Sequence, residues 1–237
     1  MAESTLTLTR LQLKQALGEQ LSISRDPNDW SADAAADVNR ILAKGLRSFY
    51  LPMIRSKNPN APLETYLWNF LIRRTTVSLS NGTNLYSLGD DFSGWVDTEL
   101  AFTTSKDWSL KLVEMWRVLE KVQAGTSMPT GITQPLLAAV EPDTFTATTG
   151  QRWKMLVWPT PTGSLTVTGR YRSEPDFFSD DAHYPLGGAL HAETLLESCL
   201  AAAEELNDTT ATIHRDRFQQ LLEASIAADQ ELHSTAA

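Results

Sequence analysis

The sequence has few of the features that mark secreted, membrane-spanning or disulfide-bonded proteins. Its 237 residues contain one cysteine, Cys199, so no disulfide can form within the chain. Nowhere do 18 apolar residues run together, and the first residues lack the basic and apolar regions of a secretion signal. We therefore expect neither secretion nor membrane insertion.

The sequence also has few residues arranged for chemistry. Cys199 lies among leucines at helical spacing, which favours a small core residue over a nucleophile. No two of the four histidines have the four-residue spacing of a helical zinc site, and no phosphate loop, nucleophile elbow or Cys-x-x-Cys motif is present. Asp90 and Asp91 are adjacent, so on an extended chain their side chains point in opposite directions. We predict no catalytic residue, no cofactor and no metal.

Basic residues are scarce, since 20 lysines and arginines stand against 29 acidic residues, for a net charge of −9. Residues 186–237 hold two arginines and nine carboxylates, which gives −7 for that segment alone. A protein that grips nucleic acid needs a basic footprint, so we do not expect tight DNA binding. Two readings of the acidic excess stay open: solubility, or a surface along which DNA phosphates slide without sticking.

The two ends of the chain show helical periodicity. Apolar stripes run through residues 11–21 and 38–49, with Ser31 as an N-cap for the second helix and Pro52 as its stop. After Pro185 the helical period returns at 195–206, and a final stripe follows after a break at 207–210.

The middle of the chain alternates apolar and polar residues, as strands do. Residues 75–79 and 84–88 flank Asn81-Gly82, which predicts a hairpin. Residues 153–158 and 165–172 are further strand candidates, and 113–123 suits a short helix or a strand. We predict an α+β fold in which a helical bundle, residues 1–66 with 186–237, carries an inserted antiparallel β-rich domain, residues 67–185.

Tryptophan is abundant in the predicted β region, which holds six of the seven in the chain. Exposed tryptophans would stack on sugars or anchor a protein partner, and buried ones would fill the core of the sheet. We expect most to be buried. Trp95 and Trp108 lie near predicted turns and are the candidates for contact with a neighbouring subunit or a tail component.

The order of several short motifs resembles a known family. The motifs are Trp68-x-Phe70-Leu71, Asn81-Gly82-x-x-Leu85-Tyr86-x-Leu88-x-Asp90-Asp91-Phe92, Trp158-Pro159-x-Pro161 before a strand that ends in Tyr171, and Pro185-Leu186 followed by His191-Ala192-Glu193. This series, over about residues 30–230, resembles phage head-to-tail connector adaptors of the tail tubular protein A type. The chain departs from the commonest pattern at Gly89, where a proline often follows the leucine, and in its short tail after Ile226.

The resemblance implies a virion protein at the head-tail junction, made in the host cytoplasm. It implies a homo-oligomeric ring, usually a dodecamer, that is not an enzyme. The implied partners are other copies of the chain, the portal protein and a tail or head-completion protein, while genome DNA passes through without specific binding and no membrane is involved. Such adaptors dock on the portal through a C-terminal helical segment, which here carries Phe218, Leu221, Leu222 and Ile226.

Two other functions compete with the adaptor. A carbohydrate-binding module built on the aromatic β region would present a flat row of exposed tryptophans and form no ring. A hydrolase that uses carboxylates such as Glu114 and Asp91 ranks last, because no acid–base constellation accompanies them.

Overall fold

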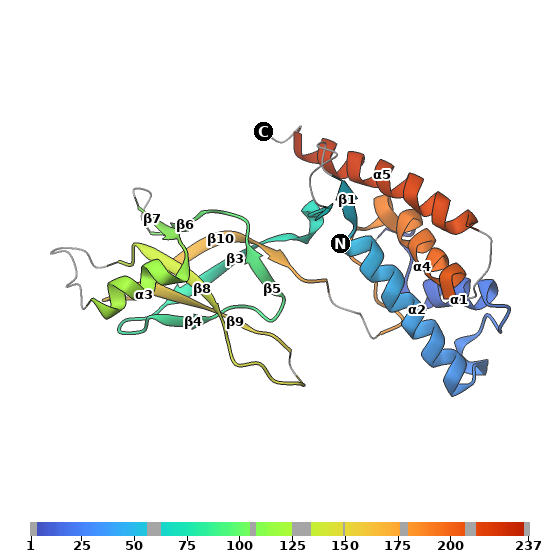
Figure 1. The fold of residues 1–237 in the computed structure, drawn as a ribbon, viewed down its shortest axis with the longest axis horizontal. Helices are drawn as coiled ribbons and strands as arrows, with labels where there is room; N and C mark the ends of the chain where they lie inside the picture. Colours follow the sequence, from blue (N-terminus) through green and yellow to red (C-terminus); the bar gives the residue numbers. More distant parts are fainter. Residues whose placement is uncertain are drawn as a thin grey trace. The chain divides into compact units, whose positions relative to one another are not determined.

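The computed structural model describes residues 4–55, 63–104, 108–124, 134–148, 150–175, 180–206 and 212–234. Contacts divide the chain into two compact units (Figure 1). Met1–Leu71 and Pro175–Ala237 form the first, which we call the helical unit, and Ile72–Glu174 form the second, the sheet unit.

The predicted fold class, a helical bundle with an inserted antiparallel β-rich domain, is wrong. In the described part of the chain the structure is a mixed α+β fold dominated by one eight-stranded sheet, with five α-helices. The sheet is not purely antiparallel, because β7 (Ser109–Leu112) and β8 (Leu137–Pro142) are parallel. A parallel pair needs a crossover between its strands, and this one contains α3 (Met115–Gln123).

The helical unit holds four α-helices and a small two-stranded sheet. The elements are α1 (Arg10–Gln20), α2 (Ala32–Tyr50), β1 (Met53–Arg55), β2 (Leu63–Thr65), α4 (Ala192–Leu206) and α5 (Ile213–Ser234). α1 begins at a capping box in which Thr9 accepts from Gln12 N–H. The Ser31 side chain accepts from Ala34 N–H, which confirms it as the N-cap of α2.

One apolar core joins the helices of this unit. The apolar stripe of α2 packs on that of α4, and both belong to one buried cluster: Leu13, Leu17, Val38, Ile41, Leu42, Leu46, Phe49, Tyr50, Trp68, Leu71, Leu195, Cys199, Leu200, Ala202 and Ala203. Trp68 is fully buried and donates its indole N–H to Phe49 O at 2.9 Å. This one tryptophan therefore fixes the end of α2 against the segment that leads to the sheet unit.

The sheet unit is a single sheet with α3 packed on β8 and β9. Besides β7 and β8 its strands are β3 (Ile72–Leu79), β4 (Leu85–Ser87), β5 (Phe92–Trp95), β6 (Glu99–Phe102), β9 (Trp153–Trp158) and β10 (Leu165–Ser173). The strand order is β3-β10-β6-β7-β8-β9-β4, and β5 also pairs with β10. Residues 113–123, for which helix and strand were both open, include the helix α3.

The hairpin predicted around Asn81-Gly82 is wrong. A turn forms there, with Gly82 at a φ of 76° and Thr83 N–H donating to Ser80 O at 3.2 Å. The two strands then part, because β3 pairs with β10 and β4 pairs with β9. The hydroxyl of Tyr86 accepts from Ser80 N–H at 3.0 Å and stands where a ladder bond would form. The turn was predicted correctly from local sequence. The strands on either side of it pair with the longer strands β10 and β9 and not with each other.

Candidate interaction surfaces

Helix α5 carries the residues predicted to meet the portal, and polar contacts bind its first turns to α4. The carboxylate of Glu204, which is buried, accepts from His214 N–H and Arg215 N–H at 3.1 Å and so caps the helix. Glu197, also buried, accepts from the His214 ring at 2.7 Å and pairs with Arg217 at 3.1 Å. Acidic groups at the start of a helix also complement its dipole, so α4 holds α5 by charge as well as by hydrogen bonds.

The C-terminal half of α5 is held by a third buried carboxylate. Asp229 accepts from the Tyr66 hydroxyl at 2.8 Å, from Asn69 N–H at 3.1 Å and from the Asn69 side-chain amide at 2.8 Å. Burial and the contact with this carboxylate raise the pKa of Tyr66 well above its usual range, so its hydroxyl stays a donor. Between the two anchors, Thr194 and Ser225 share a 2.6 Å hydrogen bond.

Because α5 is anchored in this way, only part of the surface of the predicted docking residues is free to contact a partner. Phe218, Leu221, Leu222 and Ile226 are all half-buried. Leu222 and Ile226 pack against the core of the helical unit, so part of their apolar surface is already used there. Phe218 instead lines a surface groove, together with one side of Leu222.

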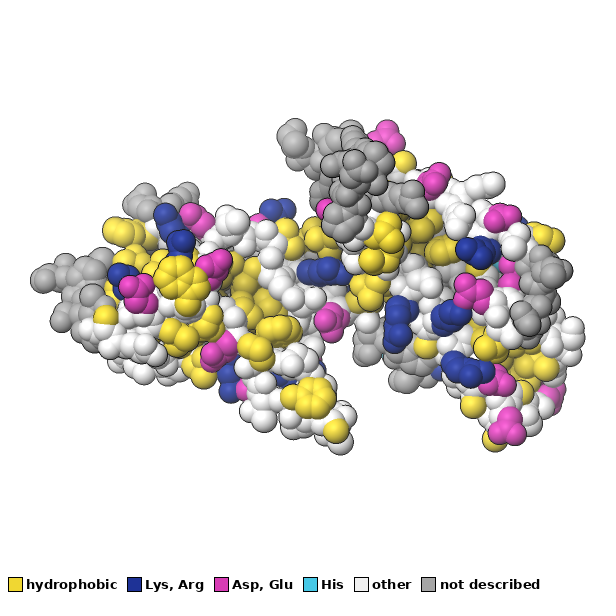
Figure 2. Space-filling view, in the orientation of Figure 1, with side chains coloured by type: hydrophobic (Ala, Val, Ile, Leu, Met, Phe, Trp, Pro, Cys, Tyr) yellow, Lys and Arg dark blue, Asp and Glu magenta, His cyan; other side chains and the backbone are white. Residues whose placement is uncertain are grey.

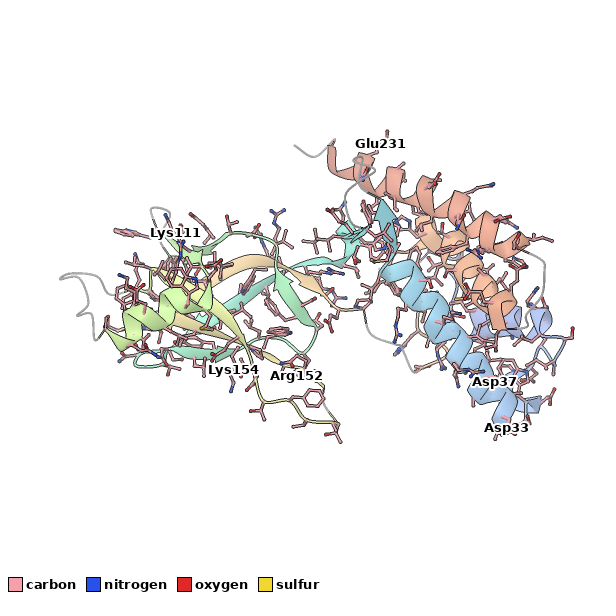
Figure 3. The ribbon with its side chains drawn as sticks, viewed as in Figure 1. Asp33, Asp37, Lys111, Arg152, Lys154 and Glu231 are labelled. Carbon is pink, nitrogen blue, oxygen red and sulfur yellow. The ribbon has the colours of Figure 1, made fainter. Side chains whose placement is uncertain are left out.

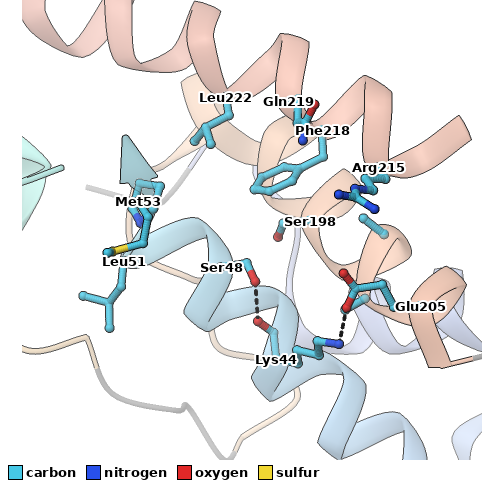
Figure 4. Close-up of a pocket in the computed structure, with 13 residues that line it drawn as sticks. Lys44, Ser48, Leu51, Met53, Ser198, Glu205, Arg215, Phe218, Gln219 and Leu222 are labelled. Carbon is cyan, nitrogen blue, oxygen red and sulfur yellow. Dashed lines mark hydrogen bonds and ion pairs between the residues drawn. The ribbon is translucent and has the colours of Figure 1, made fainter. Parts of the chain in front are cut away.

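The groove has a volume of about 360 Å³ and lies between α2, α4 and α5 (Figure 4). Leu51, Met53 and Phe218 supply much of its apolar surface, and Leu51 and Met53 are exposed. Lys44 and Glu205 form an ion pair at one side, where Arg215 also lines the groove. An apolar floor with charged residues at its margin is typical of sites that bind a side chain of another protein.

The tryptophans of the middle region divide between core and surface. Trp68 is buried, and Trp95 is half-buried with its ring 5.1 Å from that of Phe92. Trp108 is 50 % exposed and Trp116 is 57 % exposed. Of the two predicted contact residues, Trp108 therefore offers the larger free surface, while Trp95 mainly packs within the sheet unit.

The acidic C-terminal segment is less acidic at its surface than its sequence indicates. Glu197, Glu204 and Asp229, three of its nine carboxylates, are buried in the contacts that hold α5. On the face shown in Figure 2, basic and acidic side chains are interspersed over the helical unit. The sequence did not predict that these carboxylates are buried, because their burial depends on which helix faces pack together and a count of charges does not contain that information.

The remaining candidates for chemistry are placed in the core or apart from one another. Cys199 is fully buried, and burial raises the pKa of its thiol to about 12, so it is protonated at neutral pH. Within the described ranges, no three His, Cys, Asp or Glu side chains lie together in a way that could hold a metal ion. None of the described helices is long and apolar enough to cross a membrane.

A groove with apolar residues on the helical unit and two tryptophans that are exposed by half or more are features typical of proteins that bind other proteins. The model of the SU10 adaptor protein family matches residues 8–237. The chain therefore belongs to that family, a phage head-tail adaptor family, and is a structural protein of the virion. The match confirms the resemblance to phage head-to-tail adaptors. A comparison with curated proteins finds no match for the chain.

Proposed function

We propose that this chain is the subunit of a ring, of twelve copies, that joins the portal to the tail and surrounds the passage for DNA. Membership of the phage adaptor family carries the proposal. The groove beside Phe218 supports it, because a ring subunit needs apolar surface that the isolated chain leaves exposed.

Within that assembly we propose that Phe218, Leu221, Leu222 and Ile226 contact the portal. Phe218 contributes most, because its ring lines the groove while Leu222 and Ile226 are shared with the core. Leu51 and Met53 extend the same apolar surface from the other side of the groove. Trp95 and Trp108 then remain for a neighbouring subunit or a tail component, with Trp108 the stronger of the two.

The test uses the purified full chain and the purified portal of the same particle. Mass measurement and electron images of the chain, alone and mixed with portal, would reveal whether it forms a ring and whether the ring caps the portal. Phe218→Ala with Met53→Ala should weaken portal capture, whereas Glu223→Ala, an exposed change on the same helix, should leave capture unchanged. A chain that stays monomeric in the presence of portal would contradict the proposal.

A carbohydrate-binding module gains little support from the tryptophans. That function needs a flat row of exposed rings, and of the six tryptophans in the middle region only Trp108 and Trp116 are exposed by half or more. The guanidinium of Arg117 lies 5.3 Å from the ring centre of Trp116 and covers one of its faces.

A further inference from the structure

The two strands at the ends of the large sheet leave a gap between them. β3 and β4 are the terminal strands of the order, and a hollow of about 220 Å³ is lined by residues 75–78 of β3, by Tyr86 and Ser87 of β4 and by Leu88, which follows β4. Consecutive residues of a strand point to opposite faces of its sheet. A hollow lined by four consecutive residues therefore runs along the edge of β3 rather than over one of its faces.

The main chain of β3 directs into this gap hydrogen-bonding groups that no other described residue pairs with. Arg170 of β10 directs its N–H to Asp97 and its carbonyl to Val96, both on the side away from β3. Arg170 is paired with Arg74, so the alternation of an antiparallel ladder makes Arg74 and every second residue after it point outward. The N–H and C=O groups of Thr76 and Ser78 thus face the gap.

The opposite wall has the same character. Asn84 accepts from Val157 N–H and Leu88 donates to Trp153 O, so these residues of the β4 segment turn toward β9. By alternation the main-chain groups of Ser87 point away from β9, toward the gap. Among the described residues, the main-chain donors and acceptors that border the gap on both sides have no partner, as they would if a strand were missing between them.

Two arginines without an ion pair lie beside this edge. Arg74 and Arg172 are diagonal neighbours on the exposed face of β3 and β10, and neither makes a hydrogen bond or an ion pair within the described residues. Arg170, directly opposite Arg74, is neutralised by Asp97 through bonds of 2.9 and 2.7 Å. Like charges directly opposite one another are unfavourable, and the charge of Asp97, whose pKa Arg74 helps to lower, offsets part of this repulsion without forming an ion pair with Arg74.

Most other basic side chains of the sheet unit have acidic partners, so the unpaired arginines are not typical of its surface. Arg152 pairs with Asp90 at 3.0 Å, and Lys154 pairs with Asp143. Figure 3 labels the two basic side chains, both of which lie on the sheet unit. On the inner side of the gap the lining is uncharged and partly aromatic, with Val77, Leu88, Phe92 and Tyr171.

We propose that the gap between β3 and β4 binds an extended segment of another virion protein in which acidic and apolar residues alternate. Its main chain pairs with Thr76, Ser78 and Ser87 and adds a strand to the sheet. Its acidic side chains lie on the exposed face beside Arg74 and Arg172, and its apolar side chains enter the hollow. The site rests on the proposed function only in taking the partner to be a virion protein.

A protein segment fits these groups better than DNA does. Specific and non-specific DNA binding depends on neutralising many phosphates, and this face offers only two arginines that make no ion pair within the described residues, on a chain of net charge −9. Phosphates can accept from main-chain N–H groups but would leave the main-chain carbonyl groups in the gap unpaired, whereas a strand satisfies both.

The first test measures binding of a fluorescent peptide of alternating glutamate and valine to the full chain. Thr76→Pro removes an outward N–H without touching the ladder to β10, so it should abolish binding while the protein stays folded. Thr76→Val keeps that N–H and should bind as the parent does. Hydrogen exchange at Ser78 and Ser87 should slow when the peptide binds, because their amides become bonded.

The second test separates charge from strand addition. The double change Arg74→Gln with Arg172→Gln should lower the affinity for the peptide about tenfold or more. The control Arg117→Gln, at another exposed arginine of the same unit, should leave the affinity unchanged. A peptide with lysine in place of glutamate should fail to bind. Absence of peptide binding, equal binding by Thr76→Pro, or displacement of the peptide by a short DNA duplex would overturn the proposal. If the peptide binds to a chain that forms no ring, the strand-addition proposal is supported and the proposed ring is contradicted.

Discussion

Gly45 of α2 lies so close to Cys199 of α4 that a β carbon on Gly45 would stand 2.5 Å from the Cys199 α carbon. The backbones of the two helices meet at this point, and only a residue without a side chain fits. Gly45 therefore allows the close approach of the α2 and α4 backbones at this point.

Gly45→Ala should destabilise the helical unit. Alanine is better than glycine in a helix by about 1 kcal/mol, but the new carbon meets backbone atoms that cannot move aside, and overpacking costs about 1–3 kcal/mol or more. We expect the cost of the clash to exceed the gain in helix propensity, so the free energy of unfolding, measured by urea denaturation, should fall by about 1–2 kcal/mol. Gly163→Ala, where a β carbon meets nothing within 4 Å, is the control. An unchanged midpoint for Gly45→Ala would mean that the helices are further apart.

Leu195→Ala should cost more than Leu196→Ala. Leu195 is buried in the helical core, and its truncation should cost about 2–5 kcal/mol through lost burial and the cavity left behind. Leu196 is half-buried at the edge of that core, so its loss should cost about 1 kcal/mol. Denaturation midpoints of the two variants give the comparison, and equal losses would contradict the placement of Leu195 inside.

Asp229→Ala should loosen the C-terminal half of α5. The change leaves the Tyr66 hydroxyl and Asn69 N–H without their acceptor, and a buried unsatisfied donor costs about 1–3 kcal/mol. Hydrogen exchange in residues 225–231 should speed up, while exchange at the start of α5, which Glu204 caps, should change little. Glu223→Ala is the exposed control on the same helix. Unchanged exchange near Asp229 would show that apolar packing alone holds this end.

The sequence predicted local structure well and pairing poorly. Ser31, the stripes of α2 and α4 and the turn at Gly82 depend on residues near one another in the chain, and these were confirmed. The separation of β3 from β4 depends on competition with β10 and β9, which no local pattern contains. The anchoring of α5 was missed for a similar reason, because Asp229 meets Tyr66 and Asn69 across 160 residues or more.

The stability of the helical unit should fall as the pH drops from about 7.5 to about 5.5, because of His191. This ring is buried among Phe49, Trp68 and Phe70, with centroid distances of 6.1, 5.1 and 5.3 Å, and its Nδ1 has no hydrogen-bond partner among the described residues. Burial lowers the pKa of His191 below its usual 6.5, an effect that the charge of Asp229 only partly offsets.

The lowered pKa of His191 determines the sign of the change in stability with pH. The unfolded chain binds a proton at His191 near pH 6.5 and the folded chain only at lower pH, so protonation favours unfolding, and the stability contribution of neutral His191 is complete only about one pH unit above 6.5. The loss cannot exceed about 1.4 kcal/mol per pH unit for one proton. His191→Phe, which fits the aromatic surroundings, should flatten the pH dependence of the urea midpoint, whereas His183→Gln, on an exposed loop, should leave it unchanged. Because carboxylates titrate mainly below this window, a His191→Phe protein with the same slope as the parent would show that another group carries the effect.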